Sequence, residues 1–233
     1  MRDSRRKMMI SKIVNKSIDI IKAGFATVMI AGAIYSVGEV LIGSMSMGIL
    51  AVLTGIIGTL LTVSSACFFF RAYNRGSADL TDTYILFTYP EVFRKMLSVF
   101  FAIWIIGLLG DVVVRLLAFV PMINVIVTIV VIAIQFLLSL AVYLFVANQN
   151  YPTDYYLKAS ARYLGSNRLG YIGFIILIGI VPAIIQALIS GILGELIGSI
   201  VAIPLRAFVD LCVAGYVAEK IIPSEWSAGY AQF

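Results

Sequence analysis

Long apolar runs alternate with polar connections along this chain. A helix that crosses a membrane needs about 20 mostly apolar residues. Runs of about that length lie approximately at residues 23–42, 47–70, 97–118, 122–147, 169–190 and 194–218. These six runs form three consecutive pairs. The connections within the pairs, at 43–46, at 119–121 and around Gly191, leave room only for a tight turn. The pattern predicts an all-α polytopic membrane protein with six transmembrane helices in three hairpins.

An amphipathic segment precedes the first hairpin. Its apolar face would hold Ile10, Ile13, Val14, Ile18 and Ile21, and its polar face Lys12, Asn15, Lys16 and Asp19. This period is typical of a helix that lies at the membrane interface. The segments before the other two hairpins have cap residues, and we expect interfacial helices on the cytoplasmic side there too. The alternative is that these segments form a docking surface for a cytoplasmic partner.

Polar residues mark where the two later interfacial helices begin. Ser77 or Asp79 is a candidate N-cap for a helix through Leu80, Tyr84 and Phe87, which Pro90 would interrupt. Thr153 or Asp154 is a candidate N-cap for a helix over 155–164. The chain then divides into a basic amphipathic N-terminal segment (1–22), a six-span transmembrane domain (23–218) and a short cytoplasmic tail (219–233).

The composition supports lipid as the solvent of these helices. Hydrophobic residues make up 61% of the 233 residues and charged residues 12%, whereas a soluble domain is about 25% charged. A water-soluble fold of this length still exposes much of its surface, so it has no place for this much apolar side chain.

The basic residues indicate the orientation in the membrane. Apart from Arg115 and Arg206, the lysines and arginines fall within 2–22, 71–95 and 158–168 or at Lys220. Cytoplasmic loops retain Lys and Arg, so both termini are expected in the cytoplasm. The net charge of +5 then indicates contact with anionic lipid and not with nucleic acid. The basic residues expected to face lipid or a partner are Arg5, Arg6, Lys7, Lys12, Lys16, Lys158, Arg162 and Arg168.

Charged residues inside the apolar runs are the candidate site. Asp111 and Arg115 are four residues apart on the third predicted span, and Arg206 and Asp210 are four apart on the sixth. This spacing puts each pair on one helix face. One interpretation is an intramembrane polar cluster or ion path. The other is two self-neutralised pairs that fix helix packing.

Glycines, prolines and a weak repeat add detail to the spans. Gly194 and Gly198 have the small-xxx-small spacing that lets helices approach closely, and Pro182 and Pro204 are expected to kink the fifth and sixth spans. Glu39, Asp111 and Gln186 recur at comparable places in the three hairpins, 72 and 75 residues apart. This recurrence indicates a repeated hairpin.

Catalytic and metal-binding signatures are missing from the sequence. The chain has no histidine, which removes the commonest general base and metal ligand. Cys67 and Cys212 lie in apolar runs and are interpreted as small buried hydrophobic residues. We therefore expect no enzymatic activity, no metal and no cofactor.

Two cytoplasmic stretches carry a family resemblance. The first reads Phe68-Phe69-Phe70-Arg71-Ala72-Tyr73-Asn74-Arg75-Gly76, followed by Asp79-Leu80 and Phe93-Arg94-Lys95, and the second is YLKASARYLGSNR from Tyr156 to Arg168. Together they resemble an uncharacterised family of six-span bacterial integral membrane proteins, similar to the glycerophosphodiester phosphodiesterase membrane domain. The chain departs from that family's pattern at Leu164-Gly165-Ser166, where a basic "MKG" is usual.

The resemblance implies the bacterial cytoplasmic membrane as the location and brings no catalytic residues with it. The expected function is that of a non-enzymatic subunit or accessory factor of a membrane assembly, such as a transport or export system. Its partner would be another membrane protein or a second copy of the chain. The alternative is a small-solute or ion transporter or channel with a polar path at Asp111, Arg115, Arg206 and Asp210.

Overall fold

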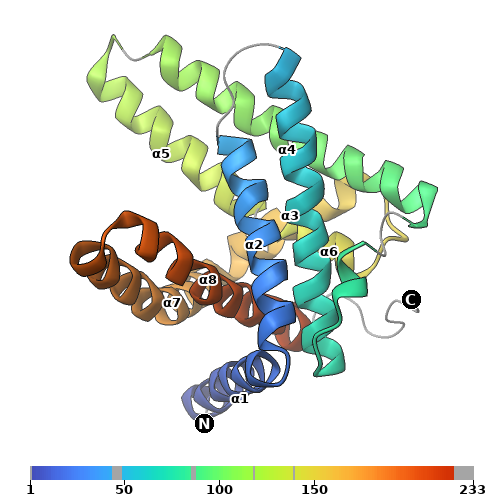
Figure 1. Cartoon of the computed structure of the whole chain (residues 1–233). Coiled ribbons are helices and arrows are strands. Elements are labelled where there is room, and N and C mark those ends of the chain that lie inside the picture. Colours follow the sequence, from blue (N-terminus) through green and yellow to red (C-terminus); the bar gives the residue numbers. More distant parts are fainter. Residues whose placement is uncertain (1, 44–48, 85–87, 118, 139, 223–233) are drawn as a thin grey trace. The chain divides into compact units, whose positions relative to one another are not determined.

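The computed structural model describes residues 2–43, 49–84, 88–117, 119–138 and 140–222, and every regular element in these ranges is a helix (Figure 1). This confirms the predicted all-α class. The elements are α1 (Arg2–Ala23), α2 (Phe25–Gly43), α3 (Ile49–Arg75), η1 (Leu80–Thr83), α4 (Pro90–Leu116), α5 (Pro121–Leu138), α6 (Ala141–Ala147), α7 (Thr153–Leu193), α8 (Glu195–Tyr216) and η3 (Val217–Ile221).

Two compact units make up the chain. The first combines Met1–Thr88 with Leu169–Gly229, and the second combines Tyr89–Arg168 with Tyr230–Phe233. Helix α7 contributes to both, because its residues 153–168 belong to the second unit and its residues 169–193 to the first.

Several of these helices are long and apolar enough to cross a membrane. Among the described residues they are Ile56–Arg75, Pro90–Val114, Leu169–Ile192 and Ile200–Ile221. Met8–Ala23 and Phe25–Gly38 add a fifth span if the two helices, which meet at 105°, are counted as one. The fold is therefore that of a multi-pass membrane protein with four or five candidate spans.

The fourth predicted span is interrupted in the structure. The run at 122–147 divides into α5, which ends at Leu138, and the short helix α6, which begins at Ala141. The apolar stretch Met122–Ile134 is shorter than a full span. Six spans in three hairpins thus stay a prediction.

In the first unit, α2, α3 and α8 pack through glycines. A Cβ added at Gly38 would lie 2.7 Å from the carbonyl oxygen of Gly58, and one added at Gly32 would lie 3.2 Å from Cβ of Ala207. These distances leave no room for a side chain. Small residues at such points let helix backbones approach closely, which is how helices associate where lipid removes the hydrophobic driving force.

Helix α1 is amphipathic as predicted, but it packs on protein through a different stripe. Ile13, Ser17 and Ile20 are at most 1% exposed, whereas the predicted face also included Ile10, Val14, Ile18 and Ile21, which are only partly buried. A Cβ on Gly215 of α8 would lie 3.0 Å from Ile13. The steps from 13 to 17 to 20 follow one side of a helix, and that side faces the bundle.

The connection after α3 is tighter than expected. Asp79 caps η1 by accepting a hydrogen bond from the backbone N–H of Thr81 at 3.0 Å, which confirms Asp79 as a cap. The element is a single 3-10 turn, and Phe87 lies outside the described residues. Pro90 begins α4 and does not interrupt a helix, because proline suits the first helical turn, where its missing N–H leaves no bond unmade.

In the second unit, two hydroxyls support the interrupted segment between α5 and α7. Ser160 donates to the carbonyl oxygen of Leu137 at 2.6 Å, and Tyr156 donates to that of Asn148 at 2.6 Å. Burial raises the pKa of Tyr156 to about 12. The end of a helix leaves carbonyl groups unpaired, and these side chains supply the missing donors.

The third hairpin has one long first helix. The segments predicted as an interfacial helix (155–164) and a span (169–190) are a single 41-residue helix, α7. Its turn to α8 is at Gly194, whose φ of 91° suits glycine, and not at Gly191. Gly198 packs against Ser190 across the turn, so Gly194 serves the turn and Gly198 serves the packing.

Candidate functional site

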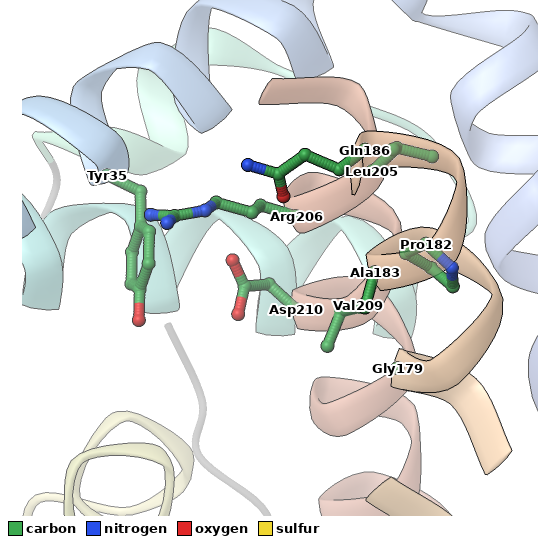
Figure 2. A pocket seen from close by; sticks show the side chains of 9 residues that line it. All are labelled: Tyr35, Gly179, Pro182, Ala183, Gln186, Leu205, Arg206, Val209 and Asp210. Atoms are coloured by element: carbon green, nitrogen blue, oxygen red, sulfur yellow. The ribbon is translucent and has the colours of Figure 1, made fainter. Parts of the chain in front are cut away.

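A pocket that holds two charged side chains lies between three helices of the first unit. It has a volume of about 310 Å³ and is open to the outside. Helix α2 contributes one side chain, and α7 and α8 contribute the others (Figure 2). The lining residues are Tyr35, Gly179, Pro182, Ala183, Gln186, Leu205, Arg206, Val209 and Asp210. All three helices are among the apolar elements considered above as spans or parts of spans.

Helix α8 supplies the charges of this pocket. Arg206 and Asp210 lie one turn apart, and Figure 2 shows both side chains extending from α8 toward α2. Arg206 is exposed and Asp210 is half-buried. The predicted placement of this pair on one helix face is therefore found. The local reason is the 3.6-residue period, which brings positions four apart to the same side of a helix.

Helix α7 supplies the opposite wall. Its buried stripe contains Tyr171, Phe174 and Ile178, and the rings of Phe174 and Tyr216 have centroids 4.5 Å apart. Tyr171 and Phe174 of this stripe contact the ring of Tyr216 on α8. The stripe continues to Gln186, whose amide points in Figure 2 toward the Arg206 side chain. The remaining face of α7 exposes apolar side chains of the kind that lipid contacts.

The polar groups lie well inside the candidate spans. Gln186 is six residues from Ile192 and Arg206 is six residues from Ile200, the ends of the spans nearest the Gly194 turn. At about 1.5 Å per residue this is a depth of about 9 Å. Charged side chains are rare at such depth and generally face a bundle interior or a water-filled cavity.

Tyr35 was missed by the sequence analysis. It lies in the middle of α2 and reaches the pocket beside Arg206 (Figure 2). Tyrosines of membrane helices favour the interfaces, so a tyrosine in the middle of an apolar run is a signal that could have found it. Gln186 appeared in the sequence analysis only as a member of the weak repeat.

The other predicted intramembrane pair is carried by a different helix. Asp111 and Arg115 are on α4, in the second unit. Their side chains lie outside the described residues. The structure therefore brings together Arg206 and Asp210 and leaves the four-residue cluster a prediction.

Among the described side chains of the predicted lipid- or partner-facing basic set, Lys12 and Lys16 contact other helices of this chain. Lys12 forms a salt bridge with Glu219 at 2.8 Å, and the amino group of Lys16 lies 4.4 Å from the centre of the Tyr73 ring. Both contacts join α1 to the ends of the helices on which it packs.

The remaining members of this basic set are on α1 and α7. Lys158 forms a salt bridge with Asp154 at 2.8 Å, and Arg162 is exposed. The side chains of Arg5, Arg6, Lys7 and Arg168 lie outside the described residues.

A second charged cluster closes the end of α3. The Asp82 side chain is 2% exposed and lies 3.4 Å from Arg71 and 3.2 Å from Arg75, and Arg75 also lies 3.5 Å from Asp79. Burial raises the pKa of the Asp82 carboxyl, and the two guanidinium groups oppose that rise. The cluster ties the η1 turn to α3. Arg71, Arg75 and Asp79 belong to the stretch that carries the family resemblance, and Asp79 was also a candidate cap, whereas Asp82 was not singled out from the sequence.

Cysteine and carboxylate side chains offer little further chemistry. Cys67 and Cys212 are buried, as predicted. Within the described part of the chain, no three Cys, Asp or Glu side chains gather to hold a metal ion. The pocket that holds Arg206 and Asp210 is the strongest candidate for a functional site in the part of the chain that the structure describes.

Comparisons with known proteins add no relative. No family model matches the chain, and no curated protein or solved structure matches it.

Proposed function

We propose that this protein is a non-enzymatic multi-pass membrane protein that binds a small polar solute between α2, α7 and α8 and carries it across the membrane. The single observation behind this proposal is the pocket of about 310 Å³ that holds Arg206, Asp210 and Gln186 inside candidate spans. A charged side chain at the bilayer centre costs about 2.5–3.5 kcal/mol on insertion scales. Charges held at such depth beside a cavity indicate a site for a polar guest.

Two prolines are in a suitable place for the movement that transport requires. Pro182 lines the pocket on α7, and Pro204 lies two residues before Arg206 on α8. Proline removes a helix hydrogen bond and lets a helix bend at that point. We propose that bending at these residues opens and closes the pocket.

Location and topology are proposed from the charge distribution. Six spans, with both termini in the cytoplasm of a bacterial cell, place the basic segments on one side of the cytoplasmic membrane and the turn at Gly194 on the other. Anionic lipid would contact the basic segments. The resemblance to six-span bacterial membrane proteins supports the same arrangement.

Accessibility of the pocket to water tests the proposed function. In a Cys67→Ala/Cys212→Ala background, Val209→Cys places a thiol in the pocket, and Ile184→Cys places one on the exposed apolar face of α7. With the protein in lipid, a hydrophilic thiol reagent should label the Val209→Cys protein and leave the Ile184→Cys protein unlabelled. Equal protection of both thiols would exclude an aqueous path through the pocket.

A role as a subunit or accessory factor of a membrane assembly is the second candidate. It is favoured by α5, which exposes large apolar side chains around most of its surface, Met122, Val125, Ile126 and Ile129 among them at 59–81%. The helices of a membrane-protein partner would cover these side chains in place of lipid. Mild extraction from the native membrane followed by mass spectrometry should then recover a stable partner, and a chain that is always recovered alone would count against this role.

A further inference from the structure

Helix α1 carries the whole net charge of the chain. Its 22 residues include seven lysines and arginines and two aspartates. The full sequence has 17 basic and 12 acidic residues, so the residues outside α1 hold ten of each and balance. From this charge and from the direction and faces of the helix, we infer that α1 lies in the headgroup region of one leaflet and binds anionic lipid there. The inference goes beyond the proposed function, because it concerns another surface and does not depend on what the pocket accepts.

The first argument is the direction of α1. It meets α2 at 105° (Figure 1). With 19 residues, α2 is about 28 Å long, close to the hydrocarbon thickness of about 30 Å. Since α2 is therefore long enough to cross without α1, a helix at this angle to it runs nearly along the membrane surface. Gly24 permits the bend, because a Cβ there would lie 2.7 Å from Cβ of Ala78.

The second argument is the position of the apolar side chains around α1. Ile13, Ser17 and Ile20 face the bundle. A second apolar stripe lies about a quarter turn around the helix from that side, and its members are only half-buried: Ile10, Val14, Ile18 and Ile21. A helix at the interface buries an apolar face at the boundary between headgroups and acyl chains. The second stripe is the face that is available for this contact.

The third argument is the polar flank, which lies about a quarter turn from the bundle side in the opposite direction. Lys12 on this flank forms a salt bridge with Glu219 at 2.8 Å while 61% of its side chain stays exposed, and Lys16 lies over the Tyr73 ring. Because charges are costly in hydrocarbon, this flank points out of the bilayer. The second stripe, on the other flank with Val14, then points into the bilayer.

Anionic lipid is the occupant that the charge of α1 favours. The cytoplasmic leaflet carries a negative surface potential, and each lysine or arginine near it adds attraction. Lys22 is exposed on the side of α1 that faces away from the bundle. The first six residues of the helix add four more basic residues, Arg2, Arg5, Arg6 and Lys7. Because α1 packs on α8, lipid bound to α1 would anchor one end of α8 to the leaflet.

The depth of a fluorescent probe tests this placement. In the Cys67→Ala/Cys212→Ala background, Val14→Cys and Asn15→Cys each carry an environment-sensitive fluorophore, and the full chain is placed in nanodiscs that contain anionic lipid. The probe at residue 14 should be quenched by lipid with a nitroxide near its headgroup and be protected from aqueous iodide. The probe at residue 15, on the exposed side of α1, should respond in the opposite way. Ile18→Cys, one turn further on, should repeat the result of Val14→Cys.

Lipid composition tests the choice of headgroup. In nanodiscs with equal amounts of phosphatidylglycerol and phosphatidylcholine, a nitroxide on the anionic lipid should quench the residue-14 probe at least about twofold more than a nitroxide on the zwitterionic lipid. Arg5→Gln/Arg6→Gln should reduce this difference, and so should high salt, which screens exposed charges. Lys158→Gln/Arg162→Gln removes two charges from α7 instead and should leave the difference unchanged.

Three results would overturn the inference. Equal exposure of the probes at residues 14 and 15 to iodide would show that the second stripe does not enter lipid. Equal quenching by the two lipids would show that α1 does not select the anionic headgroup, and the same loss of preference with the α7 pair would show that α1 is not the selective surface. None of these results bears on the pocket, whose test is the labelling of Val209→Cys.

Discussion

At Asp82, burial and ion pairing have opposite effects on the pKa of the carboxyl. Its side chain is 2% exposed between Arg71 and Arg75, and burial raises the pKa of its carboxyl despite the two guanidinium groups. Asp154 is the contrasting case, because the hydrogen bond and charge of Lys158 lower the pKa of its exposed carboxyl. The two carboxyls should therefore affect stability with opposite pH dependence.

The first prediction compares Asp82→Asn with Asp154→Asn. A carboxyl whose pKa is raised by folding adds stability below its unfolded pKa, near 3.8, and loses that contribution as the pH rises through the folded pKa. Hence the unfolding temperature of the unaltered chain minus that of Asp82→Asn should fall as the pH rises from about 4 toward 7. The unfolding temperature of the unaltered chain minus that of Asp154→Asn should instead increase as the pH rises through the acidic range up to about 4.

Thermal unfolding in detergent over a pH series is the measurement. Both variants keep the size and shape of the side chain, so Asp154→Asn serves as the matched control. The opposite result, in which the unaltered chain gains stability relative to Asp82→Asn as the pH rises, would contradict the prediction. It would show that attraction by Arg71 and Arg75 affects the pKa of Asp82 more than burial does.

At the scale of helices, α2 and α3 meet where two glycines face each other. Gly38 has no space for a side chain, because a Cβ there would lie 2.7 Å from the carbonyl oxygen of Gly58 and 3.1 Å from Leu61. A backbone oxygen within a helix has no freedom to rotate away. The contact between α2 and α3 therefore depends on the absence of a side chain at Gly38.

The second prediction is that Gly38→Ala destabilises the protein by about 1–3 kcal/mol, the usual effect of overpacking a tight interface. Gly191→Ala is the control, since its Cβ meets no atom within 4 Å and alanine is the better helix former by about 1 kcal/mol. Reversible unfolding in mixed micelles should rank Gly191→Ala at or above the unaltered chain, and Gly38→Ala below it. Equal stability of the two variants would contradict the close approach of α2 and α3.

At the scale of the whole molecule, the α5–α6 break decides the topology. If these two helices together cross the bilayer, residues before α5 and after α6 lie on opposite sides of the membrane. If they do not, the two ends of this segment lie on one side. The basic residues after α6, Lys158 and Arg162, favour crossing, because cytoplasmic segments retain Lys and Arg.

The third prediction follows from that charge distribution. In a cysteine-free background, a membrane-impermeant thiol reagent added to intact cells should label cysteines at the three short turns. Cysteines in the basic segments should be labelled only after permeabilisation. Suitable positions at or beside the turns are Ser44, Phe119 and Gly191, and suitable basic-segment positions are Ser4, Ser77 and Ser166. Gly191 is used because a Cβ added there meets no atom within 4 Å, whereas the φ of 91° at Gly194 suits glycine. Labelling of Ser166→Cys from the same side as Phe119→Cys would show that α5 and α6 do not cross.

The amino-acid sequence by itself determined the helical class and the approximate place of most helices. Apolar runs near 20 residues predicted α2, α3, α4, the second half of α7 and α8, because the hydropathy of a membrane helix is a local property. The Arg206–Asp210 pair was also predictable, since residues four apart share a helix face whatever surrounds the helix.

Only the tertiary structure decided which helices meet and what lies between them. The buried stripe of α1, the facing of Gly38 and Gly58, the break before α6 and the meeting of Tyr35 and Gln186 with Arg206 all depend on residues far apart in sequence. The sequence does not distinguish an apolar side chain that faces lipid from one that faces another helix, because lipid tails are as apolar as leucine. Periodicity therefore predicts a helix in this chain but does not say which of its faces is covered by protein.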